Sequence, residues 1–138
     1  MKKIAFLVIA LMMVASAAFT ADNITASTLK ELKGTWTGVM TFQAGVTCPI
    51  TLVIENDTVP VKAKWTIEMI PDMVGTLLNI PSGTQKHSGG NDEGKITTQG
   101  SLMWAANKNF LEVFLKRNRL DGWFYANGAR GDILLNKK

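Results

Sequence analysis

The sequence predicts an all-β domain, an up-and-down antiparallel barrel of seven or eight strands with a short N-terminal helical turn. From Thr35 onward apolar residues alternate with polar ones at period two, which is typical of strands with one buried face. Short turns separate these runs, and the hairpin registers they imply place apolar residues opposite one another. Closure into a barrel would remove the exposed edges of an open meander, and a β-sandwich is the main alternative.

The first 18 residues have the organisation of a secretory signal peptide. Two lysines follow Met1, an apolar run covers residues 4–14, and small residues occupy positions 15–18. A charged start, a short apolar segment and an Ala-x-Ala-like site are the parts of such a peptide. We predict cleavage after Ala17 or Ala18 and a periplasmic or secreted protein, with a retained membrane anchor as the alternative.

The mature chain of roughly 120 residues suits one domain with a single core. The sequence has 15 Lys and Arg against 11 Asp and Glu, and loss of Lys2 and Lys3 leaves a net charge near +2. This charge is too small to predict a nucleic acid or an anionic membrane surface as partner. No second apolar run of spanning length follows, so we expect no membrane span in the mature chain. Cys48 is the only cysteine, so we expect no internal disulfide.

Residues 19–33 are expected to form an N-terminal arm and a short helix, and residues 34–138 the barrel. Thr28 and Glu31 have the spacing of a capping box over a single helical turn. Lys33-Gly34 would end that turn and lead into the first strand.

The first three strands are expected at Thr35–Gln43, Cys48–Ile54 and Val59–Met69. A three-residue loop at 44–46 with a glycine bulge, and a two-residue turn at 56–57, would connect them. The predicted pairs are then apolar throughout: Phe42 with Cys48, Met40 with Ile50, Trp36 with Ile54, Ile54 with Val59 and Cys48 with Trp65.

The C-terminal third predicts a four-stranded meander. Asn127-Gly128 is the strongest short hairpin signal, a two-residue turn is expected at Asn118-Arg119, and a four-residue loop at 106–109. These turns predict the following pairs: Phe124 with Gly131, Val113 with Phe124, Phe114 with Trp123, and Trp104 with Leu111.

The segment between the third strand and this meander has two readings. Residues 71–81 could be a strand over Met73–Ile80 or a short helix, because Met73, Val74, Leu77 and Leu78 share a helical face. We favour the strand. Ser82–Gly94 is interpreted as a glycine-rich polar loop, long enough to be mobile or to cover an opening.

A helical turn followed by Gly34-x-Trp36 on the first strand resembles the lipocalin and calycin group of barrels. The resemblance implies that Trp36 closes the bottom of the barrel. Avidin-like barrels also open with Gly-Thr-Trp, but Gly38 and Phe42 stand where biotin-binding polar groups would be expected. Small secreted metalloprotease inhibitors are a third similar group, matched loosely at Gly34, Trp36 and Cys48.

No pattern predicts catalysis, a metal or a cofactor. His87, the only histidine, is interpreted as part of the solvated loop, and Cys48 as a buried core thiol. The carboxylates fall on the face assigned outward, so no pair of acids converges for acid–base chemistry. They are Glu55, Glu68, Glu112 and Asp121. We therefore expect a protein that is not an enzyme.

The inner face of the strands is the candidate ligand site. It collects apolar and aromatic residues, with Thr98 and Arg117 as its obvious polar members, placed opposite each other near a strand end. One hypothesis is an apolar pocket with an arginine at its mouth, suited to a small hydrophobic ligand with an acidic head; the other is a barrel filled by its own side chains. The residues predicted to bind are Trp36, Trp65, Trp104, Phe124 and Arg117.

The outward aromatics suggest a second class of function. Phe114, Trp123 and Tyr125 are predicted on the outer face, where an aromatic pair favours a protein partner or a homodimer. The alternative function is thus a protein-binding module, such as an inhibitor of a secreted enzyme. Its further determinants would be the arm at 22–26 and the loop at 82–94.

Overall fold

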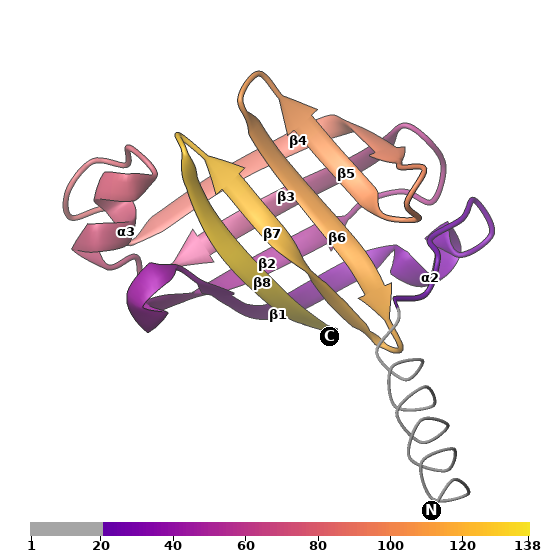
Figure 1. The fold of residues 1–138 in the computed structure, drawn as a ribbon, viewed down its shortest axis with the longest axis horizontal. Helices are drawn as coiled ribbons and strands as arrows, with labels where there is room; N and C mark the ends of the chain where they lie inside the picture. The colour runs from indigo at the N-terminus through magenta and orange to yellow at the C-terminus, as the bar shows by residue number, and fades with distance from the viewer. Residues whose placement is uncertain (1–20) are drawn as a thin grey trace, which may run out of the picture.

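Residues 21–138, described by a computed structural model, form a closed barrel of eight antiparallel strands arranged in sequence order (Figure 1). The fold class predicted from the sequence is confirmed, and closure excludes the sandwich. The predicted signal peptide, residues 1–18, lies outside the described residues. The strands are β1 (Gly34–Thr41), β2 (Thr47–Ile54), β3 (Val61–Glu68), β4 (Lys86–Ile96), β5 (Leu102–Ala106), β6 (Asn109–Lys116), β7 (Arg119–Ala126) and β8 (Ala129–Lys137).

Two short helices mark the two ends of the barrel (Figure 1). Helix α2 (Leu29–Leu32) lies near the start of β1, and α3 (Asp72–Leu77) lies between β3 and β4. The capping box expected at Thr28 is wrong, because its hydroxyl makes no cap bond. That hydroxyl instead donates to the carbonyl of Thr25 at 3.0 Å, a local turn that competes with capping.

The N-terminal arm is tied to the barrel wall. The amide of Asp22 donates to the carbonyl of Leu115 at 2.7 Å, and the amide of Ile24 donates to Gly100 at 2.8 Å. Ile24 is fully buried. The arm therefore covers the part of β6 that extends beyond the end of β5, and it is not a free projection.

The expected registers of β1, β2 and β3 are wrong by even steps, so the residues within these strands stay on their predicted faces. Val59 and Met69, the ends of the strand expected at Val59–Met69, instead lie outside β3 and are exposed. Met40 pairs with Cys48 and Trp36 with Leu52, because the chain between β1 and β2 forms a 3-10 turn, η1 (Gln43–Gly45), in place of a bulge. Between β2 and β3, the side chain of Asn56 accepts from the amide of Lys62 at 2.7 Å and organises a longer loop. Ile54 consequently pairs with Ala63.

The C-terminal meander agrees better with the sequence. The predicted pairs Phe124 with Gly131 and Trp104 with Leu111 are confirmed. The β6–β7 register is wrong by two, because the turn lies at Arg117-Asn118 and Lys116 pairs with Arg119. Arg117 adopts a φ of 58° there.

The middle of the chain overturns both expectations. Residues 72–77 form helix α3, so the strand favoured for this segment is wrong and the helical alternative is right. Pro71 precedes the helix, and Val74 is on its buried side. Residues 86–96 form strand β4, so the loop expected over Ser82–Gly94 is wrong from Lys86 onward. The glycines make room for indoles: a Cβ on Gly89 would lie 2.5 Å from Nε1 of Trp65, and one on Gly94 would lie 2.4 Å from Nε1 of Trp104.

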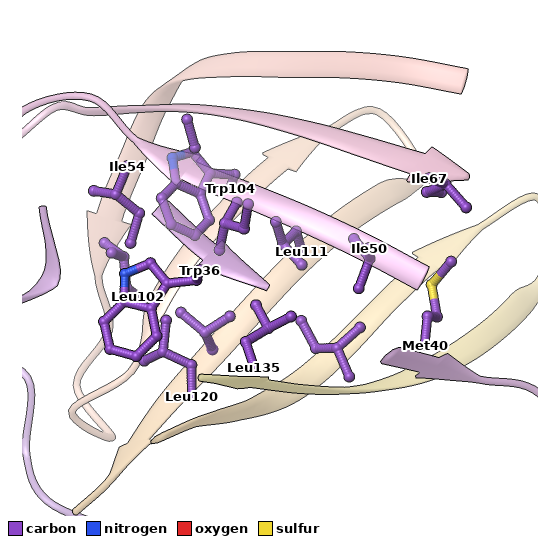
Figure 2. Packing of buried hydrophobic residues seen from close by; sticks show 14 of the residues in the cluster. Trp36, Met40, Ile50, Ile54, Ile67, Leu102, Trp104, Leu111, Leu120 and Leu135 are labelled. Atoms are coloured by element: carbon purple, nitrogen blue, oxygen red, sulfur yellow. The ribbon is translucent and has the colours of Figure 1, made fainter. Parts of the chain in front are cut away.

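The core fills the barrel toward the α2 end. Figure 2 shows Trp36 and Trp104 beside Ile54 and Leu102, while Met40 and Ile67 lie at the other end of the cluster. Nε1 of Trp36 donates to the carbonyl of Leu32 in α2 at 2.8 Å, so this indole closes the α2 end. Within residues 21–138, no helix combines the length and the apolar character that crossing a membrane requires.

The joint between β4 and β5 is the shortest ladder in the described barrel. These strands pair at Lys95 with Met103 and at Ile96 with Leu102, whereas β4 pairs with β3 from Val61 to Glu68. Farther from the β4–β5 turn, the side-chain amide of Asn91 spans the joint and donates to the carbonyl of Ala105 at 3.4 Å. The barrel wall is therefore least tightly held between β4 and β5.

Candidate functional site

A pocket of about 250 Å³ lies inside the α3 end of the barrel. Strands β3 to β7 form its walls, and Asn127 of the β7–β8 turn lies on its rim. Residue Leu78, directly after α3, covers one side. The pocket-lining residues are Trp65, Ile67, Leu78, His87, Gly89, Gly90, Asn91, Trp104, Ala106, Asn109, Phe110, Leu111, Phe124, Ala126 and Asn127.

Two partly buried aromatic rings give the pocket its shape. Trp65 on β3 and Phe124 on β7 pack edge to face, with ring centroids 5.9 Å apart and planes at 67°. Trp65 can lie flat against β4 because its paired residue there is Gly89. The pocket is thus bounded by two aromatic surfaces at a steep angle to each other.

The indole nitrogens of the barrel differ in their hydrogen bonding. Those of Trp36 and Trp104 donate to the carbonyls of Leu32 and Val61, both at 2.8 Å. Within residues 21–138, Nε1 of Trp65 has no hydrogen-bond partner. Because every buried side-chain nitrogen and oxygen in that range has one, this N–H is not fully buried, and the indole that carries it lines the pocket.

The rim of the pocket is polar but carries no Asp, Glu, Lys or Arg. Asn127 donates from its side chain to the carbonyl of Leu78 at 3.0 Å, which ties the β7–β8 turn to the segment after α3. Oδ1 of Asn109 accepts from the amide of Asn127 at 3.3 Å, so the Asn109 amide group remains available to a ligand. His87, exposed at the rim, completes this polar ring.

Three of the five predicted ligand-binding residues come together in the pocket, namely Trp65, Trp104 and Phe124. Trp36 is inside the barrel, but it fills the α2 end. Arg117, expected at the mouth, is exposed in the β6–β7 turn at that same end and lines a separate groove with Trp36. The predicted arginine contact is therefore wrong in position, and Thr98 lies in the β4–β5 turn without pairing with it.

His87 and Gly89 are pocket residues that the sequence interpretation missed. Both belong to β4, with His87 paired to Ile67 and Gly89 paired to Trp65. Since Ile67 and Trp65 face inward, their partners do as well. The signal that could have revealed them is the period-two spacing of His87, Gly89 and Asn91. These residues lie opposite β3, whose own alternation of apolar and polar residues is clear.

Groups suited to metal binding or nucleophilic chemistry do not converge in residues 21–138, where no cluster of three His, Cys, Asp or Glu side chains occurs. Cys48 is a free, buried thiol, as expected. Its burial raises the pKa of the thiol above the ordinary value of 9.0, which keeps it protonated at neutral pH. Glu112, expected to face solvent, is instead buried and accepts a hydrogen bond from Oγ of Ser101 at 2.6 Å.

The outer face carries the second predicted site. The predicted pairing of Phe114 with Trp123 is wrong, because Phe114 pairs with Asp121. The two rings are diagonal neighbours, with centroids 5.2 Å apart. Arg130 covers part of Trp123 at 4.7 Å from the ring centroid. Tyr125 stacks on Phe110 at 5.2 Å and is separate from that pair. Phe114 and Trp123 line a groove across β1, β6, β7 and β8, bordered by the exposed Val39 and Leu134.

Comparison of the chain with protein-family models, with curated proteins and with solved structures found no match. The fold and the pocket therefore define the protein only as a small, closed eight-stranded antiparallel barrel with an aromatic-walled pocket at the α3 end.

Proposed function

We propose that this protein is an exported, non-enzymatic, lipocalin-like barrel that binds a small hydrophobic ligand in the pocket at the α3 end. The asymmetry of the barrel interior carries the proposal. Trp36 fills the α2 end and satisfies its N–H there, whereas Trp65 and Phe124, packed edge to face, line an open pocket at the α3 end. A concave, mostly apolar pocket with a few polar groups is the usual form of a small-molecule site.

Export is the part of this proposal that rests on the sequence alone. The order of charged, apolar and small residues in positions 1–18 supports it. Expression of the full-length gene in a bacterial host, followed by intact mass measurement of the periplasmic fraction, tests it. We expect a chain that begins at Ala18 or Phe19, and an uncleaved chain in the membrane fraction would contradict export.

Ligand binding is tested by filling the pocket from its rim. Ala105 and Ala106 are both exposed neighbours on β5, but only Ala106 lines the pocket, because successive side chains of a strand point to opposite faces. Ala106→Phe should block binding, and Ala105→Phe is the matched control. The probes are naphthalene, a monocyclic terpenoid and octanol. Their binding is measured by saturation-transfer NMR and by tryptophan fluorescence.

We expect at least one probe to bind the wild type and Ala105→Phe, and to lose at least tenfold in affinity in Ala106→Phe. Absence of binding by every probe to a wild type with a folded circular dichroism spectrum would contradict the proposal. Equal binding by both variants would place the ligand elsewhere.

A second candidate function is a protein-binding module that acts through the outer groove. The observation in its favour is the Phe114–Trp123 pair beside Val39 and Leu134, which are 42% and 38% exposed. An inhibitor of a secreted enzyme or a homodimer would both use such a surface. The arm at 22–26 and the segment at 82–94 support this function less, since Ile24 is packed and 86–96 is strand.

A further inference from the structure

We infer that the ligand of the α3-end pocket is a small, uncharged, planar aromatic molecule that carries a hydrogen-bond acceptor. The inference rests on the proposed function and narrows it to one chemical class. Size, shape, charge and hydrogen bonding of the pocket each limit the ligand independently.

Size excludes long-chain lipids from complete burial. The pocket of about 250 Å³ has room for about eight water molecules at the volume that each occupies in the liquid. One or two fused rings fill such a space, whereas a long acyl chain exceeds it. The core blocks any extension inward, because Trp104 and Leu111, which line the pocket, and Trp36 at the α2 end are almost fully buried.

The walls favour a planar ring. Aromatic pairs are most stable when stacked with an offset or packed edge to face. Since the planes of Trp65 and Phe124 meet at 67°, a flat ligand that stacks on one wall presents its edge to the other. A flexible aliphatic chain gains neither arrangement.

The lining disfavours a charged ligand. No Lys, Arg, Asp or Glu lines the pocket, and Lys86, next to the rim residue His87, pairs with Glu68 at 3.6 Å. Burying an ion without a partner of opposite charge is costly. Arg117, the cation that the sequence placed at the mouth, lies at the other end of the barrel.

The polar groups call for an acceptor on the ligand. Nε1 of Trp65 can only donate, and it has no partner within residues 21–138. The side-chain amide of Asn109 is a second donor at the rim, because its oxygen is already engaged by Asn127. An oxygen on the ligand, such as that of an amide or ketone, would satisfy one or both N–H groups.

The test compares four probes on the full mature chain: 2-naphthamide, 2-naphthoate, naphthalene and decanamide. Relative to 2-naphthamide, 2-naphthoate changes the charge, naphthalene lacks the acceptor and decanamide lacks the ring. The affinities are measured by isothermal calorimetry and tryptophan fluorescence. We expect 2-naphthamide to bind at least tenfold more tightly than 2-naphthoate and decanamide. If either of these binds as tightly as 2-naphthamide, the ligand class is overturned while the proposed function stands.

If none of the four probes binds, nor the terpenoid and octanol, then the proposed function fails together with the ligand class. One variant distinguishes the contribution of the hydrogen bond from that of the aromatic surface. Trp65→Phe keeps an aromatic ring and removes the N–H. We expect this variant to weaken the binding of 2-naphthamide about five- to tenfold and to leave the affinity for naphthalene nearly unchanged. An equal effect on both probes would overturn the role of the Trp65 N–H.

Discussion

The indole of Trp65 on β3 packs edge to face against the phenyl ring of Phe124 on β7, although these strands are not neighbours in the barrel. The ring centroids lie 5.9 Å apart across the interior, and both rings line the pocket. This contact is therefore both a packing interaction and one boundary of the candidate site.

Phe124→Ala should test that double role. Because Phe124 is only partly buried, we expect a loss of about 1–2 kcal/mol in the free energy of unfolding. We also expect a red shift of tryptophan emission as water reaches Trp65, together with weaker binding of aromatic probes. Urea denaturation and emission spectra measure both effects, and an unchanged emission spectrum would contradict the contact.

Trp36→Phe should separate the closed end from the pocket. The substitution leaves the buried carbonyl of Leu32 without the indole donor, which costs about 1–3 kcal/mol of stability. Ligand affinity should not change, since Trp36 does not line the pocket. Denaturation midpoints and calorimetric affinities measure the two outcomes, and a large loss of affinity would show that the ends are coupled.

The buried pair Ser101–Glu112 should stabilise the β4–β5 turn. Ser101 donates to Glu112 at 2.6 Å and both are buried, so Ser101→Ala should cost about 1.5–3 kcal/mol. The double variant Ser101→Ala/Glu112→Leu removes the carboxylate that is left unsatisfied and should recover part of that loss. A double-mutant cycle measures the coupling, and additive effects would argue against the pair.

The thiol of Cys48 should make stability depend on alkaline pH. Burial raises the pKa of this thiol in the folded protein above 9.0, so the unfolded thiol ionises first as pH rises. Its contribution is therefore complete below 9.0 and is lost as pH rises through the higher folded pKa. Comparing urea denaturation of the wild type and Cys48→Ala at about pH 8 and about pH 10 isolates it; equal pH dependence would contradict the prediction.

The outer groove should mediate self-association if the exposed aromatic pair has a partner in a second copy. We expect a concentration-dependent dimer of the wild type in sedimentation velocity, and Trp123→Ala should weaken it at least tenfold. Val59→Ala is the control, because Val59 is an exposed apolar residue on the β2–β3 loop, outside the groove. A wild type that stays monomeric at all concentrations would leave no support for a dimer.

The sequence predicted which face each strand residue occupies better than which residue it opposes. In β1 and β2 the inward positions are apolar whatever residue lies across from them, so the alternation around Trp36 and Leu52 is sufficient to predict the face. A register shift of two preserves that alternation. The actual register depends on loop hydrogen bonds such as that from Lys62 to Asn56, which residue spacing does not reveal.

The candidate site was predictable only in part for the same reason. The period-two alternation predicted that Trp65, Trp104 and Phe124 face the barrel interior. The end of the barrel that each residue occupies depends instead on strand register and turn position. The turn at Arg117 therefore moved the expected cation away from the pocket. Strand β4 was missed because glycine and polar residues disfavour strands, whereas here Gly89 and Gly94 are needed beside large indoles.

The short ladder between β4 and β5 gives the barrel a preferred line of opening. Following the paired neighbours from β5 through β8 and β1 to β4, the molecule is a continuous ribbon of strands fastened by two residue pairs. Gly89, Gly90, Asn91 and Ala106 line the pocket and belong to the parts of β4 and β5 beyond these two pairs. Thermal separation of the two strands would give a ligand lateral access without melting the core around Trp36, so the exchange rate of the ligand and the global stability of the protein can be set independently.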